Sequence, residues 1–220
     1  MKTIAIIPAR GGSKRLPNKN ILELNGHPLI AHSILYAQSN ATIIEDIYVS
    51  TDDENIKKIA LDYGAKVIDR PAGISGDLAP TISALKHVLS VIEPVENVVL
   101  LQVTNPLRPQ NLLTEAFKIY KDLNCESLFT VSKNHRKFGE ISQNKFFPFN
   151  YEIGQRSQDL KPLFYENGLL YIAKAKCIEN NTIISENAYP FEVNHPFSEV
   201  DIDTIDDFGY ANYLIKNTLI

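Results

Sequence analysis

The chain has 220 residues and a mass of 24.7 kDa, and its 44% apolar and 22% charged residues are the proportions of one globular domain. The 26 acidic and 22 basic side chains give a net charge of −4, which favours neither nucleic acid nor an anionic membrane as a partner. No apolar run approaches the ~18 residues of a membrane span, and Cys125 and Cys177 stand in no metal-binding or redox spacing. We therefore expect a cytoplasmic enzyme or small-molecule-binding protein.

Short apolar runs alternate with stripes of helical spacing along most of the chain. The apolar runs predict strands at 4–7, 47–49, 66–68, 97–101, 128–131 and 169–172, and a last strand at 200–203. The amphipathic spacing predicts helices over about 29–37, 56–63, 82–92, 112–120 and 205–216. Strands that alternate with helices in this way indicate an α/β domain with a mostly parallel sheet.

The alternation stops between residues 133 and 163, where the chain is polar and aromatic. We interpret this segment as an insertion that leaves the sheet, a small subdomain or an arm at an interface. No internal repeat or low-complexity linker divides the rest of the chain. The sequence therefore predicts a single domain over residues 1–220 with one insertion.

The loop after the first strand carries the strongest signal of function. It contains Arg10, Lys14, Arg15 and Lys19, and no acidic residue occurs before Glu23. The pair Gly11-Gly12 permits a sharp turn with exposed backbone N–H groups, and the loop follows the carboxyl end of a central strand, where open α/β sheets bind ligands. Such a loop suits a polyanion of triphosphate size. The spacing of its glycines and lysines matches neither the P-loop motif nor the dinucleotide-binding motif G-x-G-x-x-G.

A pair of carboxylates near the other end of the chain could hold a cation. Asp201 and Asp203 stand two apart in a segment that we expect to be extended, so both would lie on one strand face. Mg²⁺ commonly binds one or two carboxylates together with substrate phosphates. By contrast, the acidic residues at 52–53 and 206–207 are typical of helix N-termini, with Thr204 and Asp207 forming a capping box.

Six motifs of the sequence resemble those of the acylneuraminate cytidylyltransferases, in the family's order and at about its spacing. The first is the loop Ala9-Arg10-Gly11-Gly12-Ser13-Lys14-Arg15-Leu16-Pro17-Asn18-Lys19-Asn20. The others are Ser50-Thr51-Asp52, Arg70-Pro71-Ala72, Leu101-Gln102-Val103-Thr104-Asn105-Pro106-Leu107-Arg108, Glu166-Asn167-Gly168-Leu169-Leu170-Tyr171-Ile172 and Asp201-Ile202-Asp203. The resemblance implies a Rossmann-like fold with helices on both faces of the sheet. It also implies Mg²⁺-dependent transfer of CMP from CTP to the anomeric hydroxyl of a nine-carbon 2-keto sugar acid, with release of pyrophosphate.

The resemblance also assigns roles to residues of this chain. It places the nucleotide against Arg10, Gly11, Gly12, Ser13, Lys14, Lys19, Asn20, Arg70, Asp77 and Thr81. Arg10, Lys14 and Asp203 would act in catalysis, and Asp201 and Asp203 would hold the metal ion. The sugar acid would contact Gln102, Asn167 and Tyr171, together with Lys137 and Arg156 supplied by the partner of a homodimer formed through residues 133–163.

The identity of the sugar stays open at this stage. Arg15 is more typical of relatives that activate legionaminic or pseudaminic acid, Val103 and Asn105 depart from the family's usual motif, and Ile183-Ile184 replace an aromatic pair that often lines the sugar pocket. Two other interpretations also remain. One is a Kdo-type or sugar-1-phosphate nucleotidyltransferase, and the other is a nucleotide-binding module without catalysis.

Overall fold

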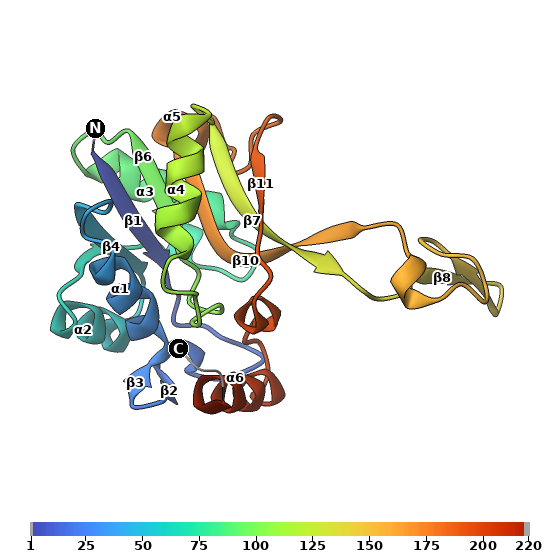
Figure 1. The fold of residues 1–220 in the computed structure, drawn as a ribbon. Helices are drawn as coiled ribbons and strands as arrows, with labels where there is room; N and C mark the ends of the chain where they lie inside the picture. Colours follow the sequence, from blue (N-terminus) through green and yellow to red (C-terminus); the bar gives the residue numbers. More distant parts are fainter. Residues whose placement is uncertain (1, 218–220) are drawn as a thin grey trace.

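The computed structural model describes residues 2–217, which form one seven-stranded sheet flanked by helices, with two small hairpins (Figure 1). The strand order is β11-β7-β10-β6-β1-β4-β5, and β10 alone runs antiparallel to its neighbours within the described residues. The strands are β1 (Thr3–Pro8), β4 (Asp46–Thr51), β5 (Lys66–Asp69), β6 (Asn97–Leu100), β7 (Ser127–Asn134), β10 (Leu163–Lys174) and β11 (Tyr189–Glu192). The predicted mostly parallel sheet is confirmed.

Helices cover both faces of this sheet, as predicted. They are α1 (Leu29–Ser39), α2 (Glu54–Asp62), α3 (Thr81–Val91), α4 (Leu112–Asp122), α5 (Ala175–Glu179) and α6 (Ile205–Asn217). Alternate residues of β1 enter two separate cores, because successive side chains of a strand point to opposite faces. Ala5 and Ile7 pack in the core with α1, α2, α4 and α6, whereas Ile4 and Ile6 pack in the core with α3 and α5.

The insertion between β7 and β10 projects from the body of the molecule as an arm (Figure 1). Its outer part is the hairpin of β8 (Gly139–Ser142) and β9 (Lys145–Pro148), which turns through Gln143 and Asn144, both with positive φ. Its stem is the pairing of the end of β7 with the start of β10, where Leu163 lies opposite Asn134. The arm exposes a set of large apolar side chains: Phe138, Ile141, Phe146, Phe147, Phe149, Ile153 and Phe164.

The predicted strand at 200–203 is wrong. Val200 and Ile202 are buried and alternate with more exposed carboxylates, but their backbone partners belong to a loop and not to a neighbouring strand. The Ile202 N–H donates to the Thr104 carbonyl at 2.8 Å, and the Asn105 side chain donates to the Val200 carbonyl at 2.8 Å. The segment therefore connects a short 3-10 helix (Pro196–Glu199) to α6 as a loop held against the residues that follow β6.

Several short elements were not predicted from the sequence. They are β11, α5, the hairpin of β2 (Glu23–Leu24) and β3 (His27–Pro28), and 3-10 helices at Lys19–Ile21, Ala72–Ile74 and Ser157–Asp159. Each is too short to display the periodicity that identifies the longer elements. Within residues 2–217, no helix combines the length and the apolar character that crossing a bilayer requires.

Candidate active site

Two adjoining cavities lie at the carboxyl edge of the parallel strands. The first has a volume of about 520 Å³ and is lined by Pro8, Arg10, Ser13, Lys14, Arg15, Leu16, Lys19, Asn20, Arg70, Asp77, Ala79, Pro80, Thr81, Ala84, Gln102, Val103, Thr104 and Asp203. Most of these residues end or follow β1, β5 and β6 or belong to the start of α3, and Asp203 comes from the segment before α6. Ligands bind at this edge of open α/β sheets, so the first cavity has the position of a ligand site.

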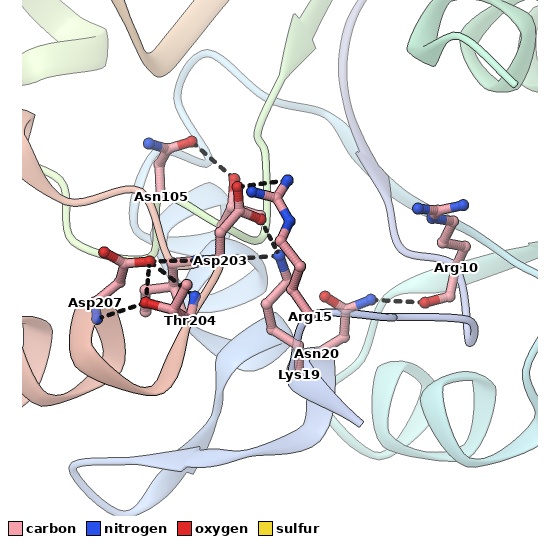
Figure 2. Close-up of polar contacts among 10 residues, drawn as sticks. Arg10, Arg15, Lys19, Asn20, Asn105, Asp203, Thr204 and Asp207 are labelled. Atoms are coloured by element: carbon pink, nitrogen blue, oxygen red, sulfur yellow. Dashed lines mark hydrogen bonds and ion pairs between the residues drawn. The ribbon is translucent and has the colours of Figure 1, made fainter. Parts of the chain in front are cut away.

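The cations of the loop after β1 converge on two aspartates of this cavity, and Figure 2 shows the contacts made to one of them, Asp203. Lys19, whose side chain is buried, donates to Asp203 Oδ1 at 2.9 Å and to the Ile202 carbonyl at 2.8 Å, and Arg15 contacts Asp203 Oδ2 at 2.9 Å. On the opposite wall, Arg10 donates to Asp77 at 2.7 Å and Lys14 forms a second ion pair with the same carboxylate. The structure therefore brings Arg10, which lies near the start of the chain, and Asp203, which lies near its end, into one cavity.

The charges around Asp77 reinforce one another. The hydrogen bond from Lys14 and its charge, followed by the hydrogen bond from Arg10, hold the pKa of the Asp77 carboxyl below its usual value. Asp77 thus stays ionised beside the loop. This wall of the cavity consists of matched opposite charges on side chains that are partly exposed to solvent.

Gly11 and Gly12 differ in what surrounds them. A Cβ at Gly11 would lie 2.7 Å from Asp53 Oδ2, whereas a Cβ at Gly12 would meet nothing within 4 Å. The Gly11 N–H donates to Asp52 at 3.1 Å, so this amide does not face the cavity as the sequence led us to expect. Asp53 caps α2 by accepting from two backbone N–H groups. The interpretation of Asp53 as a helix cap is therefore confirmed, whereas Asp52 binds the loop after β1 and does not cap α2.

The remaining residues assigned to the nucleotide also line the first cavity. Asn20 closes the loop, because its side-chain amide donates to the Arg10 carbonyl at 2.8 Å. Arg70 donates to the Ser50 hydroxyl at 3.1 Å and to the Ser50 carbonyl at 2.5 Å, and its burial lowers the pKa of the guanidinium. Thr81 is the first residue of α3, whose amino end faces the cavity.

The second cavity has a volume of about 690 Å³ and meets the first at Gln102, which lines both. Its lining residues are Gln102, Lys133, Asn134, His135, Arg136, Phe138, Tyr165, Glu166, Asn167, Gly168, Tyr171, Ser198, Glu199 and Asp201. The basic side chains come from the end of β7 and from the residues directly after it, and the acidic ones come from β10 and from the segment before α6. The cavity therefore presents basic and acidic groups to the same space.

Two tyrosine–glutamate pairs belong to the acidic part of this cavity. The Tyr165 hydroxyl donates to Glu199 at 2.7 Å, and the Tyr171 hydroxyl donates to Glu166. Burial, together with the bond to Glu199, raises the pKa of Tyr165 to about 12, and burial with the bond to Glu166 raises that of Tyr171 further. Both phenols therefore remain protonated donors over the physiological pH range.

The three residues assigned to the sugar lie together, but their side chains are not equally free. Gln102 stands at the junction of the cavities and Tyr171 lines the second. Asn167 also lines the second cavity, yet its amide accepts from Thr130 at 2.6 Å and donates to Ser132 at 2.9 Å. Asn167 thus fixes the irregular part of β10, the residues between Glu166 and Tyr171 where the register of its pairing with β7 shifts.

Asp201 and Asp203 do not share one strand face. Asp203 lines the first cavity and Asp201 the second, on either side of the buried Ile202. Loss of solvent raises the pKa of Asp201, a hydrogen bond from Thr104 opposes this, and the charge of Asp203 raises it further. The two carboxylates therefore interact electrostatically although they border different cavities.

Lys137 and Arg156 lie on the arm and line neither of the two cavities. Lys137 donates to the Gln155 carbonyl and lies 5.0 Å from the centre of the Tyr151 ring, and Arg156 pairs with Asp159 at 2.7 Å. Ile183 and Ile184 pack against the core on the α3 face and likewise line neither cavity.

The sequence did not single out most of the second cavity. Lys133, His135 and Arg136 were interpreted as the beginning of the insertion, although their position at the end of a strand at the carboxyl edge is a signal that could have found them. Glu199 gave no such signal, because the 3-10 helix that places it beside β10 was not predicted.

The family model described as "Cytidylyltransferase" matches residues 4–219 of the chain. The chain belongs to this cytidylyltransferase family. Known cytidylyltransferases also resemble it individually. The N-acylneuraminate cytidylyltransferase of Streptococcus agalactiae serotype V is 38% identical over 215 aligned residues, which cover 94% of this chain and 52% of that protein. The chain thus spans about half the length of the streptococcal relatives that it matches.

Other relatives match over nearly their full length. The pseudaminic acid cytidylyltransferase of Campylobacter jejuni serotype O:23/36 is 34% identical, and the match covers 98% of this chain and 97% of that protein. The CMP-N,N'-diacetyllegionaminic acid synthase of Legionella pneumophila is 35% identical with the same coverage. A solved structure of CMP:2-keto-3-deoxy-manno-octonic acid synthetase complexed with CTP matches all of both chains with a TM-score of 0.76 and 19% identity, which confirms the Rossmann-like fold.

Proposed function

We propose that this cytidylyltransferase moves CMP from CTP to the anomeric hydroxyl of a nine-carbon, sialic-acid-like 2-keto sugar acid and releases pyrophosphate. The observation that carries the proposal is the convergence of Arg10, Lys14 and Lys19 on a cavity at the carboxyl edge of the sheet. A cation about 4 Å from a phosphate oxygen contributes a gross attraction of ~4 kcal/mol at an effective dielectric of ~20. Several cations in one cavity would therefore hold and orient a triphosphate.

The second cavity supports the sugar acid as the other substrate. Its basic side chains Lys133, His135 and Arg136 suit a carboxylate, whereas Glu166 and Glu199 can accept hydrogen bonds from hydroxyl or amide groups. Because Gln102 borders both cavities, a sugar there would lie next to a nucleotide in the first. Attack by the anomeric hydroxyl on the α-phosphorus requires positioning and charge neutralisation more than a covalent nucleophile.

Mg²⁺ is part of the proposal, with Asp203 and Asp201 as its protein ligands. The charge of Asp203 contributes to the raised pKa of Asp201, and a divalent cation near both would remove that repulsion. Within residues 2–217, no three His, Cys, Asp or Glu side chains gather into a metal site, which fits an ion whose other ligands are phosphate oxygens and water. When bound, the ion would neutralise charge on the phosphates.

We also propose that the arm joins two copies of the chain. Its apolar side chains, Phe149 and Ile153 among them, are 79% and 82% exposed in the single chain, and an exposed apolar patch of this kind marks an interaction surface. Lys137 and Arg156 lie outside the cavities of their own chain, so a role at the sugar would require the partner's site. The cytoplasmic location expected from the sequence belongs to the same proposal, and cell fractionation tests it.

A screen of pyrophosphate release tests the proposed reaction. The purified protein, with Mg²⁺, is incubated with each of the four NTPs and with N-acetylneuraminic, legionaminic and pseudaminic acids, Kdo and several sugar 1-phosphates. We expect release only with CTP and one or more of the nine-carbon acids. Release with Kdo or a sugar 1-phosphate would indicate another nucleotidyltransferase, and binding of CTP without turnover would indicate a nucleotide-binding module.

A further inference from the structure

Arg108 is a buried cation beside both cavities that lines neither of them. Arg108 is only 7% exposed, and its guanidinium carbon lies 5.6 Å from the centre of the Tyr36 ring. No carboxylate of residues 2–217 lies within ion-pair distance of it, and burial lowers its pKa to about 10. An unpaired buried charge is costly unless hydrogen bonds compensate for it.

The hydrogen bonds of Arg108 run to three different segments of the chain. Nε donates to the Leu169 carbonyl at 2.7 Å, and one terminal nitrogen donates to the Gln102 carbonyl at 2.8 Å. The other terminal nitrogen donates to the Ser33 hydroxyl of α1 at 3.1 Å. The planar guanidinium therefore fixes the distances between the loop after β6, the irregular part of β10 and α1, which a flexible ammonium group could not do as well.

Two of these segments form the boundary between the cavities. Gln102 borders both cavities, and Leu169 follows Asn167 and Gly168, which line the second. Asn105 makes a second tie between the same segments, because its side chain donates to the Asn167 carbonyl at 3.1 Å. A displacement of the Arg108 side chain would therefore move the boundary and leave the cation loop after β1 in place.

We infer that Arg108 is a positioning residue, which sets the place of the sugar acid relative to CTP by holding Gln102 and Leu169. This inference rests on the proposed function. Arg108 itself touches neither substrate, since it lies behind Gln102 and lines neither cavity. Its loss should impair the use of the sugar acid while the binding of CTP is preserved.

The test compares wild type with Arg108→Lys, Arg108→Met and Ser33→Ala. Ser33→Ala removes one acceptor of Arg108 and a hydroxyl that also donates to the Gln102 carbonyl at 3.3 Å, without changing any charge. Lys118→Met removes an exposed cation of α4 and is the control. Calorimetry measures the Kd for CTP, and pyrophosphate release measures KM and kcat for the nine-carbon acid that wild type uses best.

We expect both Arg108 variants to raise the KM for the sugar acid at least about 10-fold and to lower kcat, with the Kd for CTP changed less than about twofold. Ser33→Ala should raise the KM for the sugar acid about threefold. If the Arg108 variants do not fold, this variant alone tests the positioning role of Arg108. A wild-type KM in the folded variants, or an equal loss of CTP binding, would overturn the positioning role. Absence of turnover by wild type would instead contradict the proposed function itself.

Discussion

Lys19 and Asp203 are the pair of residues on which the proposed site depends most. They come from opposite ends of the chain, yet Lys19 Nζ lies 2.9 Å from Asp203 Oδ1 and 2.8 Å from the Ile202 carbonyl. Because the Lys19 side chain is only 11% exposed, this contact is shielded from solvent more than the pair between Arg15 and Asp203, in which Arg15 is 71% exposed. A partly buried pair of this kind fixes the loop after β1 against the segment before α6.

Removal of the charges proposed to act on CTP should abolish most of the activity. Arg10→Ala and Asp203→Asn should each lower the rate of pyrophosphate release by two or more orders of magnitude, because the first removes a cation at the phosphates and the second removes a proposed ligand of the metal ion that would neutralise them. Circular dichroism should show an unchanged fold in both. Asp122→Asn, on an exposed face of α4, is the control and should keep wild-type turnover. Near-normal turnover in either site variant would remove that residue from the active site.

The two glycines of the loop should respond differently to the same substitution. Gly11→Ala places a Cβ 2.7 Å from Asp53 Oδ2, so either the loop or the Asp53 cap of α2 must shift. The Cβ of Gly12→Ala would have no neighbouring atom within 4 Å. Loss of a helix cap typically costs about 1 kcal/mol. We therefore expect Gly11→Ala to lower the free energy of unfolding by about 1 kcal/mol in urea titrations and Gly12→Ala to leave it within about 0.5 kcal/mol. Equal effects of the two substitutions would contradict this role of Gly11.

At the scale of elements, one aspartate ties together the amino ends of three neighbouring strands. Asp46 begins β4 and lies 2.8 Å from Lys2, which precedes β1, and 2.6 Å from Lys66, which begins β5. The hydrogen bond from Lys2, followed by that from Lys66, lowers the pKa of Asp46. This cluster lies at the edge of the sheet opposite the cavities, so it bears on stability and not on the site.

The Asp46 cluster predicts a pH dependence of stability. A pKa lowered in the folded state gives stability that is present above the pKa of the unfolded state, about 3.9, and is lost as the pH falls through the lower folded value. Asp46→Asn should therefore lower the free energy of unfolding at pH 7, by less than about 1 kcal/mol because the lysines are solvent-screened. In urea titrations the difference from wild type should shrink as the pH falls below about 4. A difference that grows in acid would contradict the assignment.

The sequence predicted the elements that leave a clear hydrophobic pattern and missed those that are too short to leave one. Buried apolar runs identified β1, β4 and β6, and amphipathic stripes identified the longer helices. At 200–203 the alternation of burial is real, but it arises from packing against the loop after β6, which no local pattern reports. The cation loop could be found because its charge and glycines are contiguous, whereas the second cavity gathers residues from segments distant in the chain.

At the scale of the whole molecule, the arm is the feature that a single chain does not explain. Its apolar residues face solvent, and its stem leads directly into the second cavity through Lys133 and Arg136. A second copy packed on the arm would cover these side chains and bring new groups to the cavity. In the proposed dimer, the oligomeric state would therefore be linked to the proposed activity.

Charges placed on the arm should separate the proposed dimer. The double variant Ile141→Asp and Phe149→Asp replaces two side chains that are each 79% exposed, so the fold of one chain should be preserved. Light scattering should give a dimer for wild type and a monomer for the variant. Leu61→Asp, at an exposed position of α2, is the control and should remain dimeric. A wild-type protein that is monomeric at assay concentrations would remove the roles proposed for Lys137 and Arg156 at a partner's site.

The central claim is that the first cavity binds CTP through the loop after β1. A crystal structure of the protein with CTP and Mg²⁺ tests it most directly. We expect the triphosphate to contact Arg10, Lys14 and Lys19, with the metal ion beside Asp203. A nucleotide bound elsewhere, with the loop and Asp203 making no contact to its phosphates, would contradict the account.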